Sequence, residues 1–295
     1  MNSTILQDRV AIVTGAGAGL GRSHALELAR QGARVVVNDL SGTAQTVVDD
    51  INRSGGTAIA NTGDVTRYEE MQAMAAHTIA RYGRIDILVN NAGILRDRTF
   101  AKMPLDDFRK VMDVHVMGTV NATKAVWAQM QLQAYGRIVM TTSSSGLYGN
   151  FGQSNYAAAK MAVVGLMQTL SLEGARHNVR VNCLAPTAVT AMTEGLISQE
   201  AAAILAPERV SEGLVFLLSD DAPTRMILLS GGGSFECAHI TMTRGIHVAG
   251  TDDTVMQLRK QRAAIEDLSN QLIPVSGWDQ AKLELHKAML KGTEK

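Results

Sequence analysis

The chain has 295 residues, of which 46% are hydrophobic and 19% charged, and its 28 basic residues balance its 28 acidic residues. This composition is typical of a globular protein with a sizeable core, and the zero net charge provides no basic field for nucleic acid or anionic lipid. No apolar run reaches the roughly 18 residues that a membrane-spanning helix needs. The seven histidines are scattered and only two cysteines occur, so we expect no metal site and no disulfide.

Short apolar runs rich in β-branched residues alternate six times with helical patterns along the chain. Strands this apolar are typically buried on both faces of a parallel sheet, with helices as the crossovers. The alternation predicts an α/β fold, a doubly wound parallel sheet of the Rossmann type. In chain order, the predicted strands are 10–14, 34–38, 58–62, 85–90, 137–142 and 179–184, and the predicted helices are 22–31, 44–54, 68–82, 105–134 and 154–177.

The pattern loosens beyond Pro186. Residues 187–207 favour a loop with short helical pieces, 207–219 a helix, and a last strand is expected near Phe235. Two amphipathic helical patterns follow after residue 251. We predict one catalytic domain at 1–250 and a helical C-terminal extension at 251–295, because so short a segment is unlike an independent domain. The extension packs on its own subunit, or forms a lid or a subunit contact.

A glycine-rich loop, TGAGAGLGR at residues 14–22, directly follows the first predicted strand. Its spacing is TGxxxGxG, and Leu20 stands where the GxGxxG fingerprint would have its third glycine. Glycine permits a tight turn and lets backbone N–H groups approach a pyrophosphate at a helix N-terminus. Since the loop lies between a strand and a helix, we expect it to bind a dinucleotide through Gly15, Gly17, Gly19, Leu20 and Gly21.

The second predicted strand ends at an acidic residue, Asp39, 18 residues after Gly21. A carboxylate at this place can accept hydrogen bonds from the adenosine ribose and would repel a 2′-phosphate. Asp39 therefore favours NAD over NADP as the cofactor. The alternative is an acid of a solvated loop.

The stretch SSSGLYGNFGQSNYAAAK, residues 143–160, holds a tyrosine and a lysine at helical spacing. Tyr156 and Lys160 are four residues apart and share one face of a predicted helix. A nearby ammonium is expected to lower the pKa of the Tyr156 phenol, which could then act as a base toward an alcohol. Tyr148 has no lysine four residues later and is expected in the wall of the substrate pocket or in the core.

The glycine loop, the NNAG at 90–93 and the Ser…Tyr-x-x-x-Lys set together resemble the short-chain dehydrogenase/reductase family, over roughly residues 8–240. The resemblance implies transfer of a hydride between a secondary alcohol and NAD. It also places the catalytic serine 13 residues before the tyrosine, which selects Ser143, with Ser145 as a weaker second. A serine hydroxyl there would orient the substrate oxygen. Thr141 and Thr142 are interpreted as strand residues.

The resemblance also implies further cofactor contacts, and Tyr156 and Lys160 are among them. The usual Pro-Gly pair is here Pro186-Thr187, and the threonine after it comes one residue early. The implied contacts are Asp64 and Val65 at the adenine, Asn91, Ala92 and Gly93 along the adenine ribose, and Pro186 and Thr190 at the nicotinamide.

His115 stands where the family has an asparagine as its fourth catalytic residue. An imidazole with one donor and one acceptor nitrogen could take part in a proton relay. It could equally be a histidine of the core with satisfied hydrogen bonds. Both interpretations stay open.

The segments NNAGILRDRTFAKM and LSGGGSFECA are similar to those of the family's (3R)-hydroxyacyl-CoA dehydrogenases. This implies a (3R)-hydroxyacyl-CoA dehydrogenase, with a hydroxysteroid dehydrogenase of the 17β type, or one for steroid side-chain acyl-CoA, as the alternative. A 3-oxoacyl-carrier-protein reductase and a non-catalytic cofactor-binding protein are less favoured, because Asp39 disfavours NADPH and the catalytic set is intact. The substrate pocket is expected from 94–99, 148–153 and 187–204.

The family assembles as homodimers or homotetramers, and the same is expected of this chain through helices 105–134 and 154–177. A small-molecule substrate is the expected partner, with neither nucleic acid nor membrane. No targeting signal is apparent, so a cytoplasmic location is the default expectation.

Overall fold

The structure is a computed structural model that describes residues 4–189, 200, 204–250 and 253–290. The chain divides into two compact units, Met1–Cys237 and Ala238–Lys295. The second unit contains the predicted extension at 251–295 together with residues 238–250.

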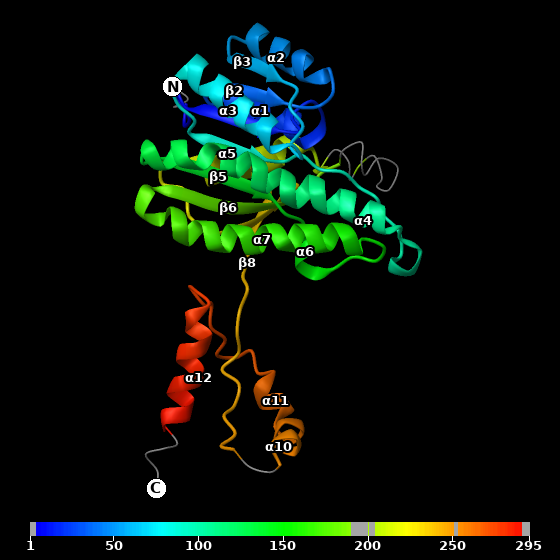
Figure 1. The fold of residues 1–295 in the computed structure, drawn as a ribbon, viewed down its shortest axis with the longest axis vertical. Coiled ribbons are helices and arrows are strands. Elements are labelled where there is room, and N and C mark those ends of the chain that lie inside the picture. Colours follow the sequence, from blue (N-terminus) through cyan, green and yellow to red (C-terminus); the bar gives the residue numbers. More distant parts are fainter. Residues whose placement is uncertain (1–3, 190–199, 201–203, 251–252, 291–295) are drawn as a thin grey trace. The chain divides into compact units, whose positions relative to one another are not determined.

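One sheet organises the first unit (Figure 1). Its strands within the described chain are β1 (Val10–Thr14), β2 (Arg34–Asn38), β3 (Thr57–Asn61), β4 (Ile87–Asn90), β5 (Gly136–Thr141), β6 (Val179–Pro186), β7 (Ile227–Gly231) and β8 (Ser234–Ala238). The order across the sheet is β3-β2-β1-β4-β5-β6-β7-β8, and the pairs from β3 to β7 are parallel. This confirms the predicted doubly wound sheet. The order reverses between β1 and β4, where ligands of such sheets typically bind.

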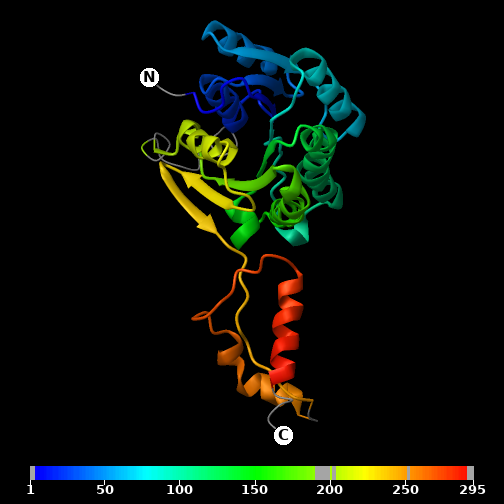
Figure 2. The same cartoon turned by 90° about the vertical axis from the view of Figure 1, so that its left-hand side faces the viewer.

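Helices cover both faces of the sheet (Figures 1 and 2). They are α1 (Gly19–Arg30), α2 (Thr43–Arg53), α3 (Tyr68–Tyr82), α4 (Leu105–Met112), α5 (Gly118–Leu132), α6 (Ser144–Tyr148), α7 (Ser154–Gly174) and α9 (Pro207–Leu218). Helix α1 contacts α2 and α9 on one face, whereas α3 contacts α5 and α4 contacts α7 on the other.

The strands are buried as their apolar runs predict. Every residue of β1 and of β5 is buried. Val13 and Val37 of the sheet pack in one cluster with Leu28 of α1 and Leu214 of α9. Because each fully buried valine or leucine contributes about 1.5–3 kcal/mol, this core fixes the strands whose carboxyl ends carry the site.

Three features of the first unit differ from the predicted elements. The helix predicted at 105–134 is interrupted by a π-helical turn, η2 (Asp113–Met117), between α4 and α5. Strand β7 and the short helix α6, each five residues long, were not predicted. Strand β8, predicted near Phe235, follows β7 through a turn in which Gly232 and Gly233 have positive φ, as two-residue hairpin turns require.

The second unit contains three helices among its described residues, α10 (Thr254–Lys260), α11 (Arg262–Ile265) and α12 (Trp278–Leu290). A pair of backbone hydrogen bonds joins Met242 to Leu272 at 2.9 and 2.8 Å. None of the described residues of these helices is buried, and Trp278 is 76% exposed.

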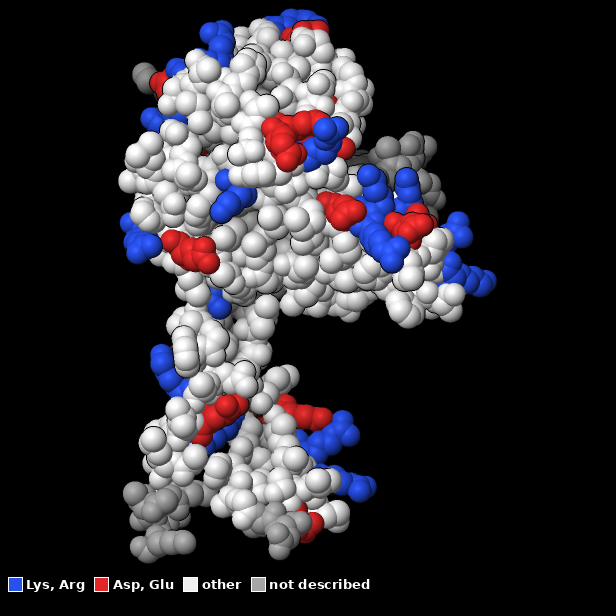
Figure 3. Space-filling view, in the orientation of Figure 1, with Lys and Arg blue, Asp and Glu red and all other residues white. Residues whose placement is uncertain are grey.

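Basic and acidic side chains lie scattered among uncharged residues on the face that Figure 3 shows. This distribution agrees with the zero net charge of the sequence. Within the described ranges, no helix is both long and apolar enough to cross a bilayer.

Candidate active site

The glycine loop turns from β1 into α1 at the point where the strand order reverses, and its backbone lines a cavity of about 260 Å³. Gly15 has a φ of 62°, and a Cβ there would lie 2.7 Å from Ala92 Cα. A Cβ on Gly21 would meet the carbonyl oxygen of Gly15. No side chain caps α1, so its first N–H groups stay available to a ligand in the cavity.

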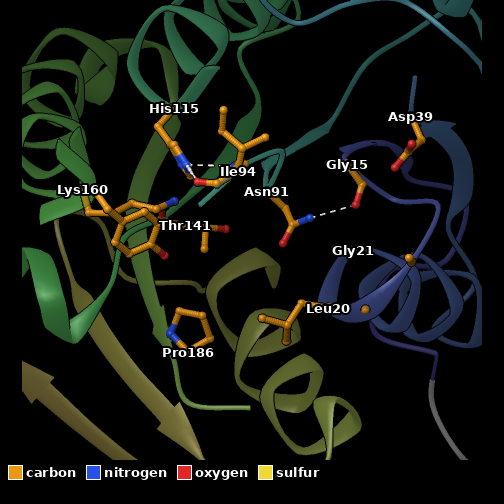
Figure 4. A pocket seen from close by; sticks show the side chains of 14 residues that line it. Gly15, Leu20, Gly21, Asp39, Asn91, Ile94, His115, Thr141, Lys160 and Pro186 are labelled. Carbon is orange, nitrogen blue, oxygen red and sulfur yellow. Dashed lines mark hydrogen bonds between the residues drawn. The ribbon is translucent and has the colours of Figure 1, made fainter. Parts of the chain in front are cut away.

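Thr14 and Asn91 tie the end of β1 to the end of β4. Asn91 Nδ2 donates to the carbonyl oxygens of Thr14 and Gly15 at 3.1 and 3.0 Å, and Figure 4 shows the bond to Gly15. Thr14 Oγ1 accepts from the backbone N–H groups of Asn91 and Ala92 at 3.1 and 3.2 Å. These bonds fix the NNAG segment against the glycine loop.

Asp39, at the end of β2, is bonded to the same loop. Its Oδ2 accepts from the N–H of Gly17 at 2.9 Å, and its Oδ1 accepts from the N–H and Oγ of Ser41 at 2.9 and 2.6 Å. These three bonds hold the carboxylate beside the cavity that it lines. The remaining lone pairs of the two oxygens could accept from ribose hydroxyls.

A second cavity adjoins the first and shares Gly15, Asp39, Gly93 and Ile94 with it, so the two form one cleft. Asp64 and Val65, expected at the adenine, and Ala92, expected along the adenine ribose, line this second cavity. Sequence reasoning missed the other residues that line it, which the fold brings in from β2, β3, α4 and η2. These are Asn38, Leu40, Gly63, Lys110 and Val114.

Tyr156 and Lys160 lie side by side at the other end of the cleft. Lys160 Nζ is 5.5 Å from the centre of the Tyr156 ring and donates to the carbonyl oxygen of Thr141 at 2.6 Å. Burial lowers the pKa of Lys160 to about 7. Burial also raises the pKa of Tyr156, although a hydrogen bond with Ser143 acts in the opposite direction.

The expected lowering of the Tyr156 pKa by Lys160 is therefore wrong for this geometry. Near neutral pH the buried lysine carries its charge only part of the time, because its own pKa is about 7. Its short bond is directed at Thr141 O and not at the phenol. Ser143 is the group beside Tyr156 that favours the phenolate.

The structure separates the two candidate serines. Ser143 is the N-cap of α6, where its Oγ accepts from the N–H of Ser145 at 3.2 Å, and its hydroxyl is near enough to the Tyr156 phenol to lower the pKa of that phenol. Ser145 Oγ donates instead to Gln153 Oε1 at 2.8 Å. Ser143 is thus the serine whose hydroxyl lies beside the tyrosine.

His115 lies in the π-helical turn and is buried against the cleft (Figure 4). Its Nε2 is 2.8 Å from Ile94 O and 3.0 Å from Ile94 N, so it pairs with this backbone in either tautomer. Its Nδ1 is buried and has no partner among the described residues. The ring meets Tyr156 edge-on, with centroids 5.2 Å apart and planes at 88°.

The imidazole of His115 stays neutral at physiological pH. Burial, assisted by the charge of Lys160, lowers its pKa to about 3, although its bond to Ile94 acts in the opposite direction. A neutral ring keeps one nitrogen as donor and one as acceptor, as a proton relay requires. Gly93 leaves room for the ring, since a Cβ there would meet His115 Cε1.

The cleft gathers most of the predicted residues. Of the others, Thr190 lies outside the described residues. Gly17 and Ser143 do not line the cleft themselves, but Gly17 contacts Asp39 and Ser143 lies beside Tyr156, and both of these partners line it. Thr141 was missed as a site residue, although its place at the end of β5 next to Ser143 could have indicated it. The predicted residues in the first cavity are Gly15, Gly19, Leu20, Gly21, Asp39, Asn91, Gly93, His115, Tyr156, Lys160 and Pro186.

Comparison with known proteins finds matches over most of the chain. A putative short-chain type dehydrogenase/reductase of Mycobacterium tuberculosis is 40% identical over 275 residues, 90% of this chain and 96% of that protein. Peroxisomal multifunctional enzyme type 2 of Drosophila melanogaster is 48% identical over 219 residues, 71% of this chain but 36% of that protein. The peroxisomal hydratase-dehydrogenase-epimerase of Saccharomyces cerevisiae is 46% identical over 221 residues, 72% of this chain but 24% of that protein. The chain thus spans only part of the length of the last two.

Solved structures agree with these matches. Full-length multifunctional enzyme type 2 from Drosophila melanogaster superposes with a TM-score of 0.82 at 36% identity, over 97% of this chain and 50% of that one. A 7α-hydroxysteroid dehydrogenase complexed with NADH and 7-oxo glycochenodeoxycholic acid superposes with a TM-score of 0.73 at 32% identity, over 79% of this chain and 96% of that one. The family model described as short chain dehydrogenase matches residues 9–201. The chain therefore belongs to the short-chain dehydrogenase family of oxidoreductases.

Proposed function

We propose that this protein is an NAD-dependent dehydrogenase that oxidises the 3-hydroxyl of a (3R)-hydroxyacyl-CoA. The observation that carries the proposal is the placement of Ser143 beside Tyr156 at one end of a cleft whose other end is lined by the glycine loop and Asp39. Relatives that are multifunctional enzymes of hydratase and dehydrogenase type support the acyl-CoA substrate.

The cleft fits a nicotinamide dinucleotide. The backbone cradle at Gly15 and Gly21 has no room for a Cβ, and the uncapped start of α1 suits a pyrophosphate. Asp39 and Asn91 would hold the adenosine half, and Lys160 and Pro186 the nicotinamide half. When bound, NAD supplies the acceptor for the hydride that leaves the substrate carbon.

The residues of the chain would handle the proton of the same step. Ser143 Oγ orients the substrate hydroxyl and stabilises charge that develops on its oxygen. Tyr156, as the phenolate, accepts the hydroxyl proton at Oη as the C–H bond breaks, and the phenol returns the proton in the reverse reaction. Lys160 would hold the ribose of the nicotinamide half. The unpaired Nδ1 of His115 would hold a water molecule through which the proton leaves the phenol, while the imidazole itself stays neutral.

A hydroxysteroid dehydrogenase is the second candidate function. The solved hydroxysteroid dehydrogenase in complex with NADH covers 79% of this chain. The three candidate substrates, a (3R)-hydroxyacyl-CoA, a 17β-hydroxysteroid and a hydroxyacyl-carrier-protein, are distinguished by the initial rates at which each reduces NAD and NADP. The proposal expects the highest kcat/KM with the acyl-CoA and NAD. A higher value for the steroid, or for NADP, would contradict it.

His115→Ala is expected to lower kcat about tenfold while the Kd for NAD changes less than about twofold, because one acid–base group contributes factors of this order or more. Titration of nucleotide binding and initial rates measure the two effects separately. An unchanged kcat would remove His115 from the proton path and leave it as a core residue.

Asp39→Asn is expected to weaken NAD binding about tenfold and to raise the NADP-to-NAD affinity ratio, because a charge-assisted hydrogen bond contributes about 1.5–3 kcal/mol and a 2′-phosphate is no longer repelled. Asp49→Asn, which removes an exposed acid of α2 bonded to Gln45, is the matched control. If the NADP-to-NAD affinity ratio were the same in Asp39→Asn and Asp49→Asn, the contact with the adenosine ribose would lie elsewhere.

The extension and the oligomer belong to the same proposal. Helices α10 and α12 expose Val255, Trp278 and Leu285 at 69%, 76% and 58%, more apolar surface than so small a unit should leave in water. We infer that the extension forms a subunit contact or a lid in a homodimer or homotetramer. Light scattering of the full chain, compared with a chain ending at residue 250, tests whether it is needed for assembly.

A further inference from the structure

Hydrogen bonds join the loop after β4 to the loop before α7, and these loops form two walls of the predicted substrate pocket. Arg98 donates its N–H to Gly152 O at 2.8 Å and forms an isolated parallel bridge with Gln153. Asn155 is fully buried and donates from Nδ2 to Arg96 O at 2.9 Å. The two walls are therefore held together next to Tyr156.

A second set of bonds runs along side chains from Asp97 to Ser145. Gln153 Nε2 donates to Asp97 Oδ2 at 2.6 Å. At the other end of the same amide, Oε1 accepts from Ser145 Oγ at 2.8 Å and from Asn150 Nδ2 at 3.0 Å. A carboxylate only accepts hydrogen bonds, so Asp97 fixes which end of the amide faces it and leaves the oxygen for Ser145.

This orientation decides the roles of the two serines. Ser145 donates its hydroxyl proton to Gln153 Oε1, whereas Ser143 lies beside the Tyr156 phenol. With the amide turned the other way, Ser145 Oγ would accept from Gln153 Nε2, and its hydroxyl proton would no longer be held by Gln153.

The charge of Asp97 reaches Tyr156 as well. Around the phenol, the described residues place the neutral ring of His115, the buried amine of Lys160 and the carboxylate of Asp97. Asp97 disfavours the phenolate and thus raises the pKa of Tyr156, in addition to the larger effect of burial. A phenol that keeps its proton up to higher pH is the better donor when a ketone is reduced.

We propose that Asp97 is a positioning residue of the active site: its carboxylate orients the Gln153 amide, which holds the Ser145 hydroxyl and leaves Ser143 as the hydroxyl beside Tyr156. The inference rests on the proposed dehydrogenase function and adds a residue to it.

Two substitutions of Asp97 separate its bond from its charge. Asp97→Ala is expected to lower kcat about fivefold to tenfold with the Kd for NAD unchanged, since it removes one charge-assisted hydrogen bond. Asp97→Asn can still accept from Gln153 and should recover part of that kcat. Both variants remove a negative charge near Tyr156, which lowers the pKa of the phenol. The low-pH limb of the profile of oxidation rate against pH should therefore move to lower pH. Asp106→Asn, an acid on α4 that is 94% exposed, is the matched control and should leave the profile in place.

A double-mutant cycle tests the path through the amide. If Asp97 acts through Gln153, then Asp97→Ala combined with Gln153→Ala should cost no more kcat than Gln153→Ala alone. Full additivity of the two effects would overturn the proposed path.

The outcomes distinguish this inference from the proposed function. If the wild type oxidises the acyl-CoA but Asp97→Ala matches it in kcat and pH profile, the positioning role is wrong and the function stands. If the wild type oxidises none of the alcohols, the proposed function is wrong. The inference about Asp97 can then still be tested by ultraviolet titration of the Tyr156 phenol, with the spectrum of Tyr156→Phe subtracted. Titration at lower pH in Asp97→Asn would support the inference, and unchanged titration would overturn it.

Discussion

Replacing Tyr156 by phenylalanine is expected to lower kcat by about 10²–10⁴-fold, the range that a single general acid–base group contributes. The substitution removes the hydroxyl that lies beside Ser143 and leaves the ring, which packs edge-on against His115. Because the ring remains, the binding of NAD in the ground state should be preserved. The Kd for NAD should therefore change less than about twofold. Stopped-flow rates of NADH formation and titration of NAD binding measure the two quantities.

Tyr82→Phe is the matched control for this variant. Tyr82 lies at the end of α3, and its hydroxyl is buried with no partner among the described residues. Its removal should leave kcat unchanged. A Tyr156→Phe variant that keeps the rate of the Tyr82→Phe control would show that Tyr156 is not the acid–base group of the reaction.

Gly21→Ala is expected to weaken NAD binding by at least about tenfold and to destabilise the fold by about 1–3 kcal/mol, as overpacking of a tight site does. The new Cβ would meet the carbonyl oxygen of Gly15, which also accepts from Asn91 Nδ2 at 3.0 Å. The substitution therefore shifts the turn against which the pyrophosphate would lie. Calorimetric titration with NAD and thermal unfolding report the two effects.

Gly42→Ala serves as the control, because a Cβ at Gly42 meets nothing within 4 Å and its φ of −63° suits alanine. It should bind NAD as the wild type does. If Gly21→Ala also bound NAD normally, the glycine loop would not be the pyrophosphate site.

The sheet was predictable because its strands are short apolar runs between polar or glycine residues. The ranges 10–14 and 34–38 are the strands β1 and β2 to the residue. The π-helical turn at Asp113–Met117 was not predictable, since one extra residue in a turn barely disturbs the helical pattern of the sequence. The turn is visible only in three dimensions, where it carries His115 against Gly93 and Ile94.

The site was partly predictable for a similar reason. Motif spacing selects the glycine loop, Tyr156 and Lys160, which the fold gathers into one cleft. Spacing could not show that Ser145 is held by Gln153, because that bond depends on the path of the loop between α6 and α7. Nor could it show how far burial lowers the pKa of Lys160.

The central claim is most directly tested by the initial rate of NADH formation from (3R)-3-hydroxyacyl-CoA, with the (3S) enantiomer measured in parallel. If Ser143 and Tyr156 fix the hydroxyl on one side of the nicotinamide, the (3R) substrate should be oxidised and the (3S) substrate should react at least about a hundredfold more slowly, as expected when a misplaced group loses its acid–base partner. Equal rates with both enantiomers, or no NADH from either, would contradict the claim.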